Sequence, residues 1–99
     1  MNEIEFEWDE RKAQSNEQKH GISFEEAQTV FYDEDARVNY DPDHSVDEDR
    51  YVLLGLSSSQ RLLVVCHVYR QNDECIRIFS ARLATKQEQQ QYRNFSYER

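Results

Sequence analysis

The stretch that decides the fold is residues 51–82, which read YVLLGLSSSQRLLVVCHVYRQNDECIRIFSAR. It contains three β-branched and apolar runs, residues 51–57, 61–70 and 75–82, with the polar breaks SSQ and QNDE between them. Breaks this short are typical of hairpins, in which the chain reverses over a few residues. The stretch therefore predicts three consecutive antiparallel strands.

The second break also predicts which side chains share a face. If it joins Arg70 directly to Cys75, then His67 lies opposite Ile78, and opposed residues point to the same side of a sheet. One face then carries Leu63, Val65, His67, Tyr69, Ile76, Ile78, Ser80 and Arg82. The other carries Leu62, Val64, Cys66, Val68, Phe79, Ala81 and Leu83. We expect helices to cover the second face, because the polar groups of the first suit an open surface. A bulge in the loop would exchange the two faces.

Before this stretch, the sequence predicts a strand and then a helix. Residues 4–8 alternate apolar and polar side chains, which is the period of a half-buried strand. Asp9 is a suitable N-cap and Gly21 a suitable C′ residue, so residues 10–20 form a helix. Ala13 is the one apolar residue inside it, which is unusually few for a helix that packs on a core.

This first helix instead carries a polar stripe. Lys12, Asn16 and His20 recur every four residues and therefore lie on one side of the helix. Trp8, just before the helix, can anchor it to the body, so that Asn16, Lys19 and His20 face a cleft.

A second helix begins at the capping box SFEE of residues 23–26. Its apolar seam is Phe24, Ala27, Val30 and Phe31. We expect Phe24, Val30 and Phe31 to be buried against Leu62, Val64 and Phe79. Residues 36–40 alternate as a strand, residues 41–49 form an acidic loop, and the capping box TKQE of residues 85–88 opens a C-terminal helix.

The predicted order is strand, two helices, four strands and a helix. It corresponds to the α+β class: one two-layer domain over residues 1–99, with a small twisted antiparallel sheet, two N-terminal helices and one C-terminal helix.

The charge of the chain is uneven. Of its 99 residues, 12 are basic and 20 acidic, which gives a net charge of −8, but the charge is −11 over residues 1–50 and +3 over residues 51–99. Any contact with phosphates therefore needs a local basic patch in the second half. The N-terminus is acidic, and the longest aliphatic run is only five residues, 62–66. We therefore expect a cytoplasmic protein without a signal peptide or membrane contact.

The cysteines and histidines do not suggest a metal site or a disulfide. In the expected register Cys66 and Cys75 lie about 13 Å apart at about 3.3 Å per residue, too far for a disulfide. His20, His44 and His67 lack the paired spacing of zinc ligands. Residues 41–47 match a calcium loop poorly, because Val46 stands where glycine is required. We expect neither a metal nor a cofactor.

Taken together, these motifs resemble the BrnT family of ribonuclease toxins from bacterial type II toxin–antitoxin modules. The matching segments are Phe6-Glu7-Trp8-Asp9 with Lys12 and Asn16; residues 19–27 (KHGISFEEA) with Val30-Phe31; Asp43-His44-Ser45 with Glu48 and Arg50; Gly55 and Ser57; residues 61–65; Ile76-Arg77-Ile78; and Ser80-Ala81-Arg82 with Ala84-Thr85, Glu88 and Tyr92. Their order and spacing together are more specific than any one piece.

The resemblance implies a RelE-like fold with its helices on one face of the sheet. It also implies metal-independent endoribonuclease activity that inhibits translation and growth. The expected partners are RNA, a ribbon-helix-helix antitoxin called BrnA, and operator DNA only through that antitoxin. An alternative is a catalytically inactive binding module that acts only through the antitoxin.

Cleavage by 2′-OH attack requires a base, an acid and cations that stabilise the phosphorane. By motif match the expected catalytic residues are Lys19, His20, Arg50 and Arg82. The expected substrate-binding residues are Trp8, Asn16, His44, His67 and Ser80. Which residue acts as acid or base stays open at this point.

Overall fold

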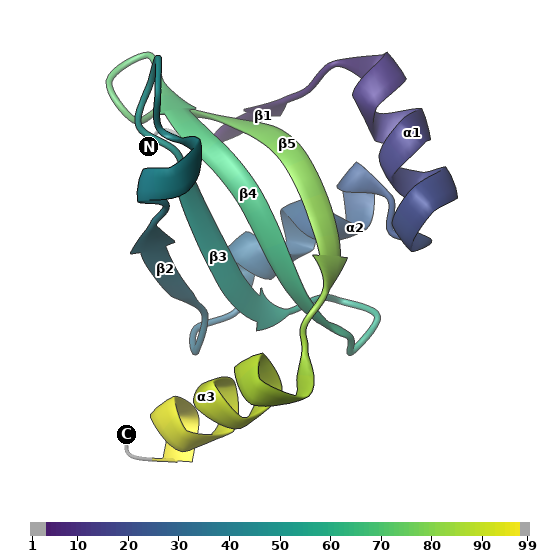
Figure 1. The fold of residues 1–99 in the computed structure, drawn as a ribbon, viewed down its shortest axis with the longest axis vertical. Helices are drawn as coiled ribbons and strands as arrows, with labels where there is room; N and C mark the ends of the chain where they lie inside the picture. Colours follow the sequence, from purple (N-terminus) through teal and green to yellow (C-terminus); the bar gives the residue numbers. More distant parts are fainter. Residues whose placement is uncertain (1–3, 98–99) are drawn as a thin grey trace.

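The computed structural model describes residues 4–97 and shows a five-stranded sheet with three α-helices around it (Figure 1). In chain order the elements are β1 (Glu5–Glu7), α1 (Glu10–His20), α2 (Phe24–Thr29), the 3-10 helix η1 (Val30–Tyr32), β2 (Arg37–Tyr40), the 3-10 helix η2 (Pro42–His44), β3 (Tyr51–Leu56), β4 (Leu62–Arg70), β5 (Cys75–Leu83) and α3 (Lys86–Tyr97). The α+β class and the order of strands and α-helices agree with the sequence analysis; the two 3-10 helices are additional.

The sheet is mixed, so the expectation of an antiparallel sheet is wrong. Its strand order is β1-β5-β4-β3-β2, and β1 runs parallel to β5, while the other neighbours are antiparallel. The hairpin breaks determine the direction of β3, β4 and β5. By contrast, β1 is followed by two helices and reaches the far edge of the sheet, where no turn motif specifies its direction (Figure 1).

The predicted helix ends are confirmed. The side chain of Asp9 accepts hydrogen bonds from two backbone N–H groups at the start of α1, and Gly21 ends the helix with a φ of 71°. Ser23 caps α2 and Thr85 caps α3, each by accepting from the N–H group three residues later. These ends could be predicted because capping depends on a few neighbouring residues.

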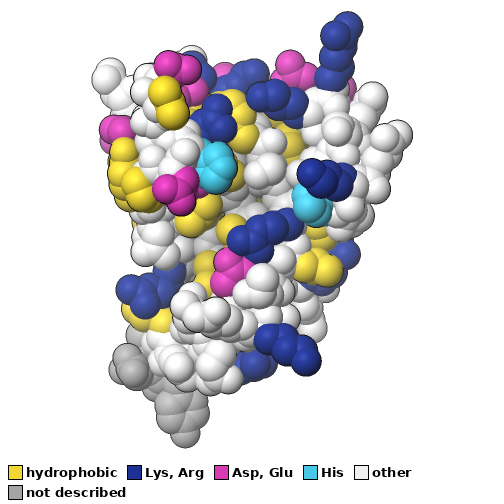
Figure 2. All heavy atoms as spheres, in the orientation of Figure 1, with side chains coloured by type: hydrophobic (Ala, Val, Ile, Leu, Met, Phe, Trp, Pro, Cys, Tyr) yellow, Lys and Arg dark blue, Asp and Glu magenta, His cyan; other side chains and the backbone are white. Residues whose placement is uncertain are grey.

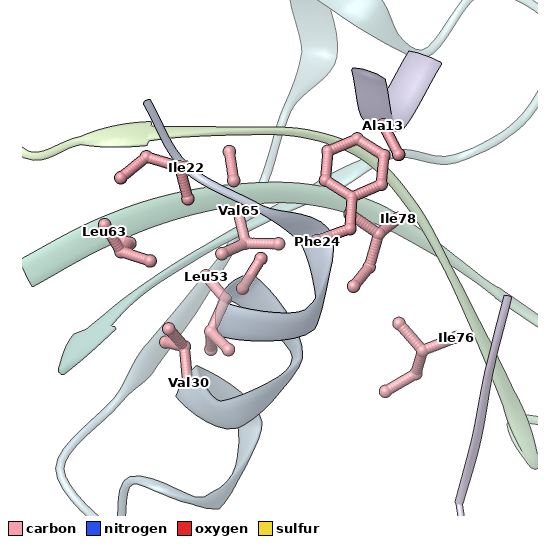
Figure 3. Close-up of a cluster of buried hydrophobic side chains, with 11 residues drawn as sticks. Ala13, Ile22, Phe24, Val30, Leu53, Leu63, Val65, Ile76 and Ile78 are labelled. Carbon is pink, nitrogen blue, oxygen red and sulfur yellow. The ribbon is translucent and has the colours of Figure 1, made fainter. Parts of the chain in front are cut away.

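The core lies between the sheet and helices α1 and α2. Its buried apolar side chains are Ala13, Ile22, Phe24, Ala27, Val30, Leu53, Leu63, Val65, Ile76, Ile78 and Ala81 (Figure 3). The two helices therefore cover the face that we expected to be open. Phe24 and Val30 are fully buried and Phe31 partly, as the seam predicts, but the expected partners Leu62, Val64 and Phe79 are wrong.

A β-bulge explains part of this difference. Arg70 pairs with Cys75 and His67 with Ile78, as predicted, but Cys66 pairs with Ser80, so one residue of β5, Phe79, is extra. Such a residue reverses the facing of all residues after it. Ala81 therefore points to the helices, and Ser80 no longer shares a face with Ile78. The bulge lies within the strands and not, as we considered, in the loop.

Helix α3 packs on the other face of the sheet. Tyr92 lies against a small cluster with Leu54, Val64 and Ala84, and its hydroxyl donates to Asp33 Oδ2 at 2.8 Å. The helices thus do not all lie on one face, contrary to the implication of the family resemblance. Figure 1 shows α3 across one end of the sheet, which leaves the rest of this face open. Within residues 4–97, no helix has the length and apolar character needed to cross a bilayer.

Candidate functional site

A pocket of about 360 Å³ opens on the face of the sheet that α1 and α2 leave uncovered. Figure 2 views this open face and shows Lys and Arg side chains spaced around its central part. The pocket is lined by Lys12, Asp41, His44, Arg50, Val52, Val64, Cys66, Phe79, Ser80 and Arg82. It is therefore built from α1, the segment between β2 and β3, and the three central strands.

Two cations lie over the ring of Phe79 in this pocket. The guanidinium carbon of Arg50 lies 4.1 Å from the centre of the Phe79 ring, and Lys12 Nζ lies 5.0 Å from it. Cations are attracted to the electron-rich face of an aromatic ring. The bulged residue of β5 therefore brings together two positive charges, one from α1 and one from the residue just before β3.

His44 is oriented in the pocket by Asp41. Its Nδ1–H donates to Asp41 Oδ2 at 2.8 Å, since a carboxylate accepts hydrogen bonds. The hydroxyl of Ser45 also donates to the backbone oxygen of Asp41 and accepts from the N–H of Arg50. These two hydrogen bonds connect the two ends of the loop between β2 and β3. With Nδ1 carrying the proton, the neutral imidazole keeps its lone pair on Nε2 and can accept a proton there.

Arg82 and Cys66 complete the polar part of the lining. Arg82 forms a two-pronged ion pair with Glu88 of α3, at 2.8 and 2.9 Å, which raises the pKa of the guanidinium. Burial raises the pKa of the Cys66 thiol, so this thiol is a poor nucleophile at neutral pH. The pocket thus combines permanent cations with one oriented imidazole.

The structure brings together four of the residues expected from the sequence: His44, Arg50, Ser80 and Arg82. Sequence reasoning did not select the other lining residues, among them Lys12, Asp41 and Phe79. In the sequence, Lys12 belongs to the polar stripe but not to the expected site residues, Phe79 to the expected core, and Asp41 to an acidic loop that matches a calcium loop poorly. The signal for Asp41 was present in its spacing of three residues from His44, which suits a hydrogen bond within one turn.

Two expected residues lie outside the lining because they are buried. Asn16 is fastened to β5 by hydrogen bonds to Ala81. His67 is fully buried on the helix-covered face, so the expectation that it shares an open face with Ser80 is wrong. Its Nδ1–H donates to Val65 O at 3.0 Å, and burial lowers its pKa.

Three other expected residues lie at or next to α1 and do not line the pocket. The ring of Trp8 packs edge-on against the ring of Phe24, with 5.8 Å between the two ring centres. It therefore anchors the start of α1 to the core, as expected. Lys19 and His20 form the basic last turn of α1, about two turns after Lys12. Among residues 4–97, no group of three or more His, Cys, Asp and Glu side chains is placed to hold a metal ion.

Comparisons with known proteins identify the family. The family model described as "Ribonuclease toxin, BrnT, of type II toxin-antitoxin system" matches residues 8–88. A similar solved structure is the crystal structure of the Brucella abortus ribonuclease toxin BrnT. It is 23% identical in sequence and has a TM-score of 0.62, and the match covers 87% of this chain and all of that chain. At this identity, the likeness shows a shared fold. A search of the curated proteins gives no match. On the strength of the family model, the chain belongs to the BrnT family of ribonuclease toxins of type II toxin–antitoxin systems.

Proposed function

We propose that this chain is an endoribonuclease that cleaves RNA in the pocket of the open face, without a metal ion, by attack of a ribose 2′-OH on the adjacent phosphate. The observation that carries the proposal is the convergence of His44, oriented by Asp41, with the guanidinium groups of Arg50 and Arg82 in one pocket. Oriented imidazoles and bidentate cations are the groups that this reaction requires.

In the proposed reaction, Nε2 of His44 takes the proton of the 2′-OH. The 2′ oxygen forms a bond to phosphorus, the bond from phosphorus to the 5′ oxygen breaks, and the leaving oxygen takes a proton from solvent water. Arg50 and Arg82 bind the phosphate oxygens and stabilise the charge of the phosphorane, while Lys12 adds a compact charge. Asp41 stabilises the imidazolium that forms on His44, as an acceptor for its Nδ1–H.

We assign Lys19 and His20 a role at the edge of this site. Both belong to the helix that carries Lys12 into the pocket, and they give its last turn a basic character. In the proposal, His20 and Lys19 contact RNA next to the scissile phosphate. Trp8, Asn16 and His67 contribute by fixing the elements that carry the pocket, which follows from their packing and hydrogen bonds.

The proposal extends to the partner, the fold and the compartment. We propose one RelE-like domain over residues 1–99 that acts on RNA in the cytoplasm and inhibits translation. A BrnA-like ribbon-helix-helix antitoxin neutralises it and links it to operator DNA. The family membership and the charge difference between the two halves of the chain support such a partner.

The test is cleavage of a defined RNA by the purified chain in the presence of a chelator. We expect products with 2′,3′-cyclic phosphate ends. His44→Ala lowers the rate by about 10² to 10⁴, the usual contribution of a general acid or base. Arg82→Lys lowers it clearly, because it loses the two-pronged donor. Lys86→Ala, an exposed cation of α3 outside the pocket, serves as the control.

Two outcomes would contradict the proposal. Wild-type rates in both His44→Ala and Arg82→Ala would remove the pocket from the mechanism. An absence of cleavage by the wild-type chain, together with tight binding of the antitoxin, would favour the inactive binding module.

A further inference from the structure

The guanidinium of Arg82 is held by two acceptors at the base of α3. Its Nη1 and Nη2 atoms donate to the two carboxylate oxygens of Glu88 at 2.8 and 2.9 Å, and Nη1 also donates to Leu83 O at 3.2 Å. We propose that Glu88 is a positioning residue for RNA cleavage, which turns the free edge of the Arg82 guanidinium toward the scissile phosphate. This inference rests on the proposed function.

The count of donors shows which edge stays free. A guanidinium has five N–H groups. The three hydrogen bonds to Glu88 and Leu83 use both N–H groups of Nη1 and one of Nη2. The Nε–H and the second N–H of Nη2 remain, and no other group among residues 4–97 accepts a hydrogen bond from Arg82. These two N–H groups point in the same direction and can bind two oxygens of one phosphate.

Glu88 is itself fixed, so it can impose an orientation. The N–H of Thr85 donates to Glu88 Oε1 at 2.8 Å, and the N–H of Glu88 donates to Thr85 Oγ1 at 3.2 Å. This is the reciprocal capping box that begins α3. Arg82, the same capping box and lesser contributions lower the pKa of Glu88 to about 2, so its carboxylate stays charged. The carboxylate of Glu88, fixed at the start of α3, thus holds one edge of the guanidinium of Arg82, which lines the pocket.

A second pair in the same chain provides a matched comparison. Glu26 binds Arg61 with two prongs, and its Oε2 also accepts from the Ser57 hydroxyl at 2.7 Å. Neither Glu26 nor Arg61 lines the pocket. This pair is therefore a similar ion pair without a role in the proposed chemistry, and it controls for the general effect of losing a carboxylate.

An opposite role for Glu88 is also testable. A carboxylate with two oxygens on Arg82 resembles a bound phosphate, so Glu88 could instead compete with RNA. In that case, removal of its charge would raise the affinity for RNA, whereas a positioning role requires that it fall.

The experiment is a double-mutant cycle of Glu88→Gln in the wild-type and Arg82→Ala backgrounds, with Glu26→Gln as the control. Glutamine keeps the size of the side chain and an oxygen for the capping bond. We expect Glu88→Gln to lower kcat/KM for RNA cleavage about tenfold in the wild-type background and to have no effect where Arg82 is absent. Glu26→Gln changes kcat/KM by less than about twofold, although it lowers thermal stability.

The inference is overturned if Glu88→Gln cleaves RNA at or above the wild-type rate, or if it loses as much activity in the Arg82→Ala background. The same cycle is measured on binding of an RNA oligonucleotide that carries 2′-O-methyl groups at every position and therefore cannot be cleaved by 2′-OH attack. If the wild-type chain does not cleave RNA, the proposed function fails, and the binding cycle still decides the role of Glu88. If it does not bind this RNA either, both proposals fail.

Discussion

Asn16 of α1 and Ala81 of β5 exchange two hydrogen bonds: Asn16 Nδ2 donates to Ala81 O at 2.8 Å, and Ala81 N donates to Asn16 Oδ1 at 3.1 Å. The same Nδ2 donates to Ile22 O at 3.0 Å. The side-chain amide therefore pairs with β5 in the way that a neighbouring strand would. This explains how a helix with only one buried apolar residue, Ala13, stays on the body.

The first prediction concerns this amide. Asn16→Ala leaves three buried backbone groups of Ile22 and Ala81 without partners, and we expect it to lower the free energy of unfolding by about 2 to 4 kcal/mol. Urea denaturation measures the change. Gln18→Ala, at an exposed position of the same helix, is the control and should shift stability by less than about 0.5 kcal/mol. Equal small losses in both variants would show that the amide does not fasten α1.

The second prediction tests the corrected core. Phe24 is fully buried among the side chains of the helix-covered face, so Phe24→Ala should cost about 3 to 5 kcal/mol. Val46→Ala removes apolar atoms at a position that is 89% exposed and should cost almost nothing. A loss below about 1 kcal/mol for Phe24→Ala in urea melts would contradict the described packing.

The third prediction concerns the close contact between β3 and η1. A Cβ atom on Gly55 would lie 2.8 Å from Ala36 Cβ and 2.8 Å from Val30 Cγ1. Because these neighbours are packed side chains, Gly55→Ala should cost about 1 to 3 kcal/mol through overpacking. Ser59→Ala, in the exposed turn after β3, is a suitable control. An unchanged melting temperature in Gly55→Ala would mean that the neighbouring side chains make room for the added methyl group at no cost in stability.

The fourth prediction is a pH dependence. The pKa of Glu88 falls from its ordinary value of 4.5 to about 2, chiefly through Arg82. A lowered folded-state pKa stabilises the fold above the ordinary value, and this stabilisation is lost as the pH falls from 4.5 toward 2. We therefore expect the wild-type chain to be more stable than Glu88→Gln at neutral pH and the difference to shrink across this range. A constant difference would contradict the shifted pKa.

The fifth prediction concerns the antitoxin, if it approaches the phosphate-binding pocket as proposed. Carboxylates of the antitoxin would meet Arg50 and Arg82, and its basic part would meet the acidic residues 33–49. Association should then slow about tenfold as salt rises from about 50 to about 500 mM, and RNA should compete. A salt-independent rate, or a complex that holds RNA and antitoxin together, would favour inhibition at a distance.

The helices and strands of this fold could be predicted from the sequence, but the side of the sheet to which each strand residue points could not. Asp9, Gly21 and the two capping boxes define the helix ends through contacts a few residues apart. The face of each strand residue depends on whether Phe79 is paired or extra. The sequence around Phe79 and Ser80, IRIFSARL, contains no glycine or proline that would indicate a bulge.

Two of the buried polar residues, Asn16 and His67, show a second limit. Asn16 was expected at the site as part of the polar stripe of the first helix, and His67 as part of the sheet face that was expected to be open. Asn16 bonds with Ala81, 65 residues away, and His67 is satisfied by Val65 O and the Tyr69 hydroxyl. The partner of Asn16 is too distant in the sequence to be predicted from residue spacing, and the partners of His67 depend on how its ring is turned, which the sequence does not give. The hydrogen bond between His44 and Asp41 could have been predicted, because the two residues lie three positions apart on one turn.

The extra residue in β5 determines which deletions in this strand the fold can accept. Deleting Phe79 would leave the pairs Cys66–Ser80, Val65–Ala81 and Val64–Arg82 in place, so Ala81 and Arg82 would keep their faces. Deleting the regularly paired Ala81 would instead bring Arg82 opposite Val65, on the helix-covered face, and would bury its charge. Point substitutions can change the pocket and the core separately, whereas a deletion at a regularly paired position changes both. We therefore expect deletions in β5 to be tolerated at Phe79 and far less at its regularly paired positions.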